Sequence, residues 1–62
     1  MKKFTEQEIA NWRKYEKVRL SAEFNMFDPR AQTSTGLTYE EYMFTMKNYT
    51  ELVEFINLNL IS

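Results

Sequence analysis

Two copies of one helix-starting motif constrain the fold of this chain more than any other feature of its sequence. Thr5-Glu6-Gln7-Glu8 and Thr38-Tyr39-Glu40-Glu41 both fit a capping box. In this motif the threonine hydroxyl accepts from the N–H three residues later, and the glutamate accepts from the threonine N–H. Hydrophobic residues flank each box as a staple pair: Phe4 with Ile9, and Leu37 with Tyr42. We therefore expect helices to begin near residues 6 and 39.

The first half of the chain reads as a long helix followed by a short one. The first helix is predicted over 6–22, because no Gly or Pro interrupts it and apolar residues recur every three or four positions. Asp28 and Pro29 then read as an N-cap and first helical residue of a short piece ending near residue 33. The single glycine, Gly36, indicates a turn, and we predict a mobile loop over 33–37.

The second half reads as two further helices. The helix that follows the second capping box should run over 39–47, with Asn48 ending it, and Thr50 is interpreted as the cap of a last helix. One alternative stays open, because 56–60 alternates apolar residues with asparagine in the pattern of a strand. The predicted fold is all-α and a single domain over 1–62, with three main helices and a short helical turn.

The last eleven residues of the chain are unusually apolar for so small a protein. A chain of 62 residues buries only about 60% of the surface that its unfolded form exposes. The end of the chain either packs back on the first helix or is covered by a second copy, and we favour a homodimer, the commonest small oligomer. The predicted dimer contacts are the seven large apolar residues of this end: Leu52, Val53, Phe55, Ile56, Leu58, Leu60 and Ile61.

Composition argues against several classes of function. The chain has no cysteine and no histidine, which removes disulfides, the usual zinc sites and nucleophiles activated by histidine. It has one glycine, so it has no glycine-rich loop that could hold phosphates. Several carboxylates lie at predicted helix starts, where capping explains them better than catalysis. We expect no enzyme activity, no catalytic residues, no cofactor and no metal.

Charge gives little reason to expect nucleic acid or membrane as a partner. The formal net charge is −1, whereas nucleic-acid binders normally carry a clear positive excess. A basic strip on the first helix could contact phosphates, or it could be a solvated helix face: Arg13, Lys14, Lys17 and Arg19. No apolar run follows the basic residues at the start of the chain, and none is long enough to span a bilayer. We expect a cytoplasmic protein.

The segment Phe24-Asn25-Met26-Phe27-Asp28 has two interpretations. Its phenylalanines and methionine could close the end of the first helix and pack in the core, while Asn25 and Asp28 hold turn backbone groups. Part of the cluster could instead be an exposed anchor for a partner, because methionine adapts well to irregular surfaces. The sequence favours the core interpretation and leaves the second open.

Two segments resemble a family of very small phage and prophage proteins of unknown function that carry an Asn-Met-Phe-Asp motif. The similar segments are Val18-Arg19-Leu20-Ser21-Ala22-Glu23-Phe24-Asn25-Met26-Phe27-Asp28 and Tyr49-Thr50-Glu51-Leu52-Val53-Glu54-Phe55-Ile56, about a third of the chain. Between them this chain has a longer connection with its own capped helix. The resemblance implies a phage origin and a helical fold, and it brings no catalytic residues.

These observations together predict a non-enzymatic protein that works by binding another protein. The resemblance implies a bacterial host protein as the target, for example an antiviral defence component, which the chain would inhibit in the host cytoplasm. The predicted contacts are aromatics left exposed by the dimer and an arginine near the predicted loop: Tyr39, Phe44 and Arg30. Two alternatives stay open, a small DNA-associated regulator and a structural or assembly accessory of the phage particle.

Overall fold

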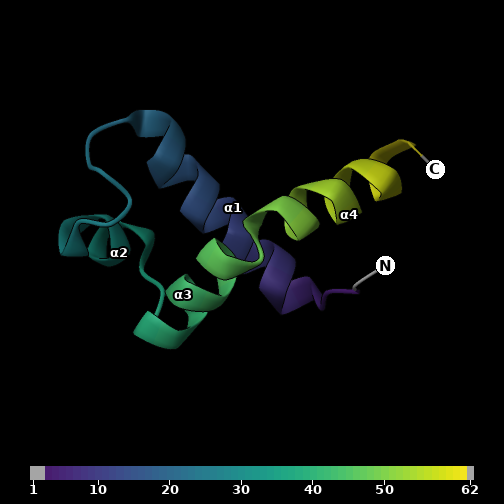
Figure 1. Ribbon diagram of the computed structural model, residues 1–62, viewed down its shortest axis with the longest axis horizontal. Coiled ribbons are helices and arrows are strands. Elements are labelled where there is room, and N and C mark those ends of the chain that lie inside the picture. The colour runs from purple at the N-terminus through teal and green to yellow at the C-terminus, as the bar shows by residue number, and fades with distance from the viewer. Residues whose placement is uncertain (1–2, 62) are drawn as a thin grey trace.

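The computed structural model describes residues 3–61, with the side chains of 60 and 61 left aside, and the regular secondary structure of this part of the chain consists of helices alone. The helices are α1 (Glu6–Ser21), α2 (Pro29–Thr35), α3 (Tyr39–Lys47) and α4 (Tyr49–Ile61). Figure 1 shows α3 and α4 crossing α1, with α2 at one end of the molecule and the end of α4 at the other. The all-α prediction is therefore confirmed, with the short helical turn realised as α2.

Both predicted capping boxes are present. In the first, the Glu8 N–H donates to Thr5 Oγ1 over 3.1 Å, and the Thr5 N–H donates to Glu8 Oε1 over 2.8 Å. The second box, which starts α3, joins Thr38 and Glu41 in the same way, with distances of 3.2 and 2.9 Å. The Thr38 N–H also keeps the pKa of Glu41 below its usual value. Both helices therefore begin where the sequence placed them.

The predicted mobile loop over 33–37 is wrong. Residues 33–35 form the last turn of α2, and Gly36 ends that helix with a φ of 75°. Thr35 and Leu37 are buried. The Thr35 hydroxyl donates to the Gln32 carbonyl over 2.6 Å and accepts from the Leu37 N–H over 3.1 Å, so it holds the turn together. Three consecutive hydroxyl residues suggested a solvated loop, but one of them is buried and fully hydrogen-bonded.

The start of the last helix also differs from the prediction. The helix begins at Tyr49, so Thr50 lies inside it and is no cap. Asn48 alone separates α3 from α4, and its backbone N–H and side-chain amide both donate to the Phe44 carbonyl over 3.0 and 2.9 Å. The strand alternative for 56–60 is wrong, since these residues are helical. A continuous backbone hydrogen-bond pattern, beginning with Leu52 N–H to Asn48 O at 2.9 Å, outweighs the weak helix preference of asparagine.

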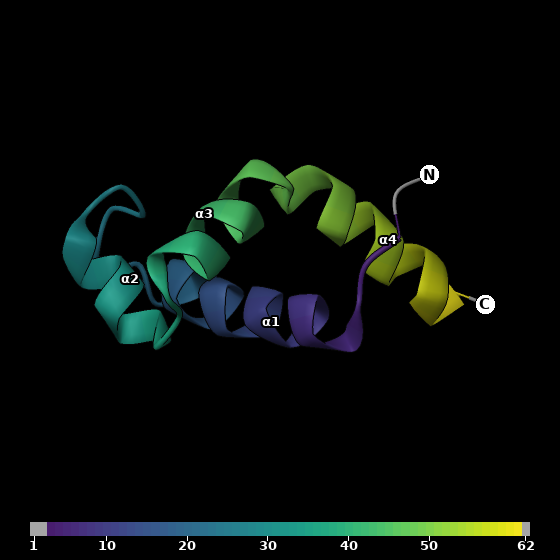
Figure 2. The same ribbon diagram turned by 90° about the horizontal axis from the view of Figure 1, so that it is seen from below.

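The hydrophobic core forms where α2, α3 and the start of α4 pack against α1. Figure 2 shows α3 and α4 running along one side of α1, with α2 at one end of the molecule. Tyr15, Ala31, Leu37 and Tyr42 are its buried members, and half-buried residues pack around them: Val18, Phe24, Met26, Met43, Met46 and Tyr49. A second aromatic contact lies outside this cluster. The Phe4 ring packs edge-on against the rings of Phe44 and Phe55, with centroid distances of 6.2 Å to Phe44 and 5.7 Å to Phe55. Most aromatic residues therefore serve the core of this short chain.

Candidate functional site

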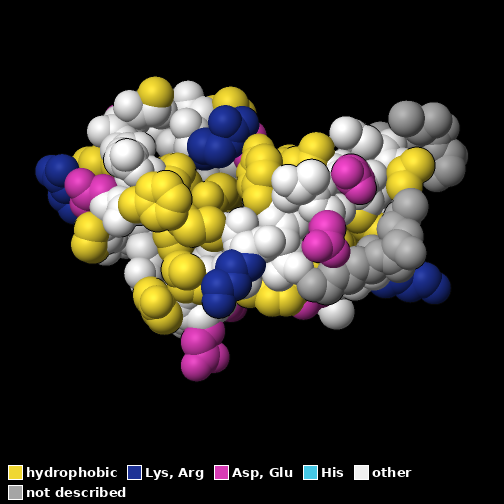
Figure 3. All heavy atoms as spheres, viewed as in Figure 1, with side chains coloured by type: hydrophobic (Ala, Val, Ile, Leu, Met, Phe, Trp, Pro, Cys, Tyr) yellow, Lys and Arg dark blue, Asp and Glu magenta, His cyan; other side chains and the backbone are white. Residues whose placement is uncertain are grey.

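A hydrophobic hollow lies between α3 and the segment that leads into α2. It has a volume of about 270 Å³, and we call it the methionine cleft. Its lining is largely methionine and aromatic: Met26, Phe27, Pro29, Tyr39, Tyr42, Met43 and Met46, with Asp28 and Gln32 as polar members. Figure 3 shows hydrophobic side chains gathered over α2 and α3 on the face that it presents. Methionine side chains are flexible and polarizable, so such a cleft can fit irregular apolar groups.

Local hydrogen bonds at Asn25 shape the segment on one side of this cleft. The Asn25 side-chain oxygen accepts from the Phe27 N–H over 2.9 Å, and its carbonyl accepts from the Asp28 N–H over 2.8 Å. This turn directs the Met26 side chain into the protein, where it is half-buried, and leaves Phe27 84% exposed. The two interpretations of this segment are therefore both partly right, because Phe24 and Met26 pack on the core while Phe27 does not.

One long-range hydrogen bond ties the turn to α3. The Tyr42 hydroxyl donates to the Met26 carbonyl over 2.6 Å. Tyr42 is buried beside Tyr15, with ring centroids 5.2 Å apart, and this burial raises the pKa of its hydroxyl above the usual value. Because Tyr42 is held by the core, the bond fixes the position of the turn that carries Phe27. An exposed aromatic ring on a fixed backbone loses little entropy when a partner covers it.

The predicted contact residues do not all lie at the cleft. Tyr39 lines it and is 66% exposed, as expected, and its contact with a partner stays a prediction. Arg30 lies beside it on α2, where its guanidinium pairs with Asp28 over 2.9 Å and stands 5.1 Å from the Phe24 ring centroid. The hydrogen bond from Arg30 holds the pKa of Asp28 below its usual value. Phe44 is half-buried against Phe4, away from the cleft, and is not exposed as expected.

The predicted dimer residues differ widely in exposure. Leu52 is fully buried by its own chain, so it has no surface to offer a second copy. Val53, Phe55 and Ile56 are half-buried, and Leu58 is 46% exposed. Leu60 and Ile61 have side chains outside the described part of the structure. More of the apolar end is therefore covered within one copy than the sequence suggested, although Figure 2 shows α4 extending past the N-terminal start of α1.

A polar cluster that sequence reasoning missed joins α1 to α4. The Tyr49 hydroxyl donates to Glu16 Oε2 over 2.6 Å, and the Arg19 guanidinium donates to the same carboxylate. Arg19 also lies 5.5 Å from the centroid of the Tyr49 ring. The hydrogen bond from Arg19 lowers the pKa of Glu16, while burial raises the pKa of Tyr49. The partners are 33 residues apart, and no local pattern signals such a contact.

The carboxylates considered as catalytic candidates have structural roles where the structure describes a bond. Glu41 closes a capping box, and Asp28 caps α2 by accepting from the Arg30 N–H over 2.9 Å. Among residues 3–61, no group of three His, Cys, Asp or Glu side chains is placed to hold a metal ion. In the same range, no helix is both long and apolar enough to cross a membrane.

Comparison with known proteins gives no match. No protein-family model matches the chain, and neither a curated protein nor a solved structure matches it. The resemblance to small phage proteins therefore stays a prediction.

Proposed function

We propose that this chain is a non-enzymatic binding protein that holds an apolar segment of another protein in the methionine cleft. The observation that carries this proposal is Phe27, which is 84% exposed at the edge of an apolar hollow and stands on a turn fixed by Tyr42. Large aromatic side chains at the centre of an interface supply much of its binding energy. Covering the exposed part of one phenylalanine is worth about 2 kcal/mol.

The partner that we propose is a bacterial host protein, such as an antiviral defence component, which the bound chain inhibits by covering a functional surface. The resemblance of residues 18–28 to small phage proteins supports this choice, because the Asn-Met-Phe-Asp motif forms the turn that presents Phe27. Residues that the resemblance singles out thus build one wall of the cleft. The site of action would then be the host cytoplasm.

We also propose that two copies associate through α4. Leu58 is the most exposed large apolar residue among the described side chains of this helix, and half-buried Val53, Phe55 and Ile56 would extend the contact. In Figure 1 the end of α4 lies at the opposite end of the molecule from α2, and residues that lead into α2 line the methionine cleft, so this dimer would leave both clefts open. Leu58→Glu should lower the mass measured by light scattering. Ile56→Glu should do so too, but it also removes contacts within one copy.

The binding proposal is tested by capture of host proteins on the immobilised chain. Phe27→Ala and Tyr39→Ala should each reduce the captured partner at least tenfold, since each removes an aromatic side chain at the edge of the cleft. Leu20→Ala is the matched control, because Leu20 is 69% exposed and does not line the cleft. Equal capture by the Phe27 variant and the Leu20 control would contradict the proposal.

A further inference from the structure

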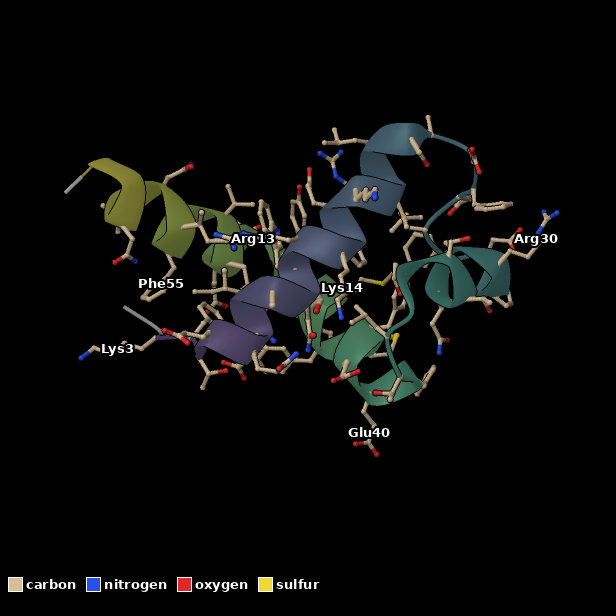
Figure 4. All side chains as sticks on the ribbon, turned by 180° about the vertical axis from the view of Figure 1, so that it is seen from behind. Lys3, Arg13, Lys14, Arg30, Glu40 and Phe55 are labelled. Carbon is tan, nitrogen blue, oxygen red and sulfur yellow. The ribbon has the colours of Figure 1, made fainter. Side chains whose placement is uncertain are left out.

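The basic strip of α1 is divided by the structure into residues with different surroundings. Arg19 is engaged by Glu16 and Tyr49, so it is not available to a ligand. Figure 4 shows Arg13 on the side of α1 that faces α4, and Lys14 on the side that faces α2 and α3. Lys17 lines the same hollow as Lys14. Two lysines of the strip therefore remain together at one place.

These two lysines line a hollow of about 300 Å³ between α1 and α2, which we call the lysine hollow. Ser34 belongs to the last turn of α2 and lines it from the other helix. Val18 and Phe24, both half-buried, give it an apolar part. The lysine hollow thus combines cationic and hydroxyl donors with an apolar surface, on a different set of residues from the methionine cleft.

The donors of the lysine hollow have no strong partners within the described residues. Lys14 and Lys17 form no salt bridge there, although Lys14 acts at longer range on Glu41. Ser34 makes no side-chain hydrogen bond in the same part of the chain, whereas the Thr35 hydroxyl already donates to Gln32 O over 2.6 Å. Three exposed donors from two helices therefore line one hollow without a protein hydrogen-bond partner among the described residues.

We infer that the lysine hollow binds the phosphate group of a small organic phosphate monoester. Lysine ammonium groups bind phosphate as point charges, and the Ser34 hydroxyl adds a neutral donor. The organic part of the ligand would lie on Val18 and Phe24. Two features limit the affinity: Glu23 also lines the hollow, and the carbonyl ends of α1 and α2 are close by. The dissociation constant should accordingly be in the millimolar range.

The test is to titrate the full chain with phenyl phosphate and, separately, with inorganic phosphate. Binding is monitored through the amide chemical shifts in NMR spectra. Phenyl phosphate should bind at least about threefold more tightly, because its ring covers apolar surface. The largest shift changes should fall in residues 14–24 and 33–35. Equal affinity for the two probes, or shift changes spread evenly over all basic residues, would overturn the inference.

Single substitutions separate this site from general charge effects. Lys14→Gln and Lys17→Gln should each weaken phenyl phosphate binding about three- to fivefold, the upper part of the range for exposed ion pairs. Glu23→Gln should strengthen it about twofold, a gain that misfolding cannot produce. Arg13→Gln removes the same charge from the other side of α1 and should change the affinity less than twofold. An Arg13 effect equal to the Lys17 effect would contradict the site.

The outcome does not depend on the proposed protein partner. Phe27 lies outside the lysine hollow, so Phe27→Ala should leave phenyl phosphate binding unchanged while it reduces capture of the host protein at least tenfold. Loss of both activities in the Phe27 variant would contradict the separation of the two sites.

Discussion

Removing one hydroxyl group, in Tyr42→Phe, should loosen the turn that presents Phe27. The Tyr42 hydroxyl donates to the Met26 carbonyl over 2.6 Å, and this is the hydrogen bond by which α3 holds the turn. The substitution keeps the buried ring and leaves a half-buried carbonyl without its donor, which costs about 1 to 2 kcal/mol. In a chain of 62 residues that loss lowers the melting temperature by about 4 to 8 °C for each kcal/mol.

The matched control is Tyr39→Phe, at the same cleft. Tyr39 is exposed, and its hydroxyl makes no hydrogen bond within the described residues, so its loss should change stability by less than about 0.5 kcal/mol. Thermal unfolding followed by circular dichroism compares the two variants, and amide exchange reports on residues 25–28. Equal melting temperatures together with unchanged exchange in the Tyr42 variant would refute the reasoning.

Three further substitutions test the fold. Ala22→Gly should raise the free energy of unfolding, measured by denaturant titration, by about 0.5 to 1 kcal/mol. Ala22 ends α1 with a φ of 57°, which glycine adopts without strain. A lower free energy of unfolding in the variant would contradict this. Leu52→Ala should lower the free energy of unfolding by about 2 to 5 kcal/mol, because Leu52 is fully buried. Leu58→Ala should lower it by under about 0.5 kcal/mol at concentrations where the chain is monomeric. Equal losses in the two variants would contradict the burial of Leu52. Glu16→Gln should flatten the pH dependence of stability below the unfolded pKa of about 4.5. The folded pKa of Glu16 is lowered, so its contribution is complete above 4.5 and disappears as the pH falls through the folded value; an unchanged pH profile would contradict this.

The starts of α1, α2 and α3 could be predicted from the sequence because their causes are local, whereas the start of α4 was not. A capping box needs only four consecutive residues, and both boxes formed with the expected bonds at Thr5 and Thr38. The N-cap at Asp28 and the stop at Gly36 depend on neighbouring residues in the same way. Such features are determined by residues close together in the sequence, so they can be predicted without knowledge of the fold.

The features that were missed depend on tertiary contacts. Thr35 is buried because Leu37 anchors the following turn in the core, and a run of hydroxyl residues gives no sign of this. The hydrogen bond from Tyr49 to Glu16 and the one from Tyr42 to Met26 each join distant segments. Only the position of Phe27 had a local signal, since the side-chain oxygen of Asn25, two residues earlier, can hold its N–H in a turn.

Binding through the methionine cleft is tested most directly by hydrogen exchange on the complex with the captured host protein. Amides in 25–29 and 39–46 should become protected when the partner is bound, and the end of α1 around Leu20 should exchange as it does in the free chain. Protection confined to other parts of the chain, with 25–29 and 39–46 unchanged, would contradict the assignment of this cleft as the binding site.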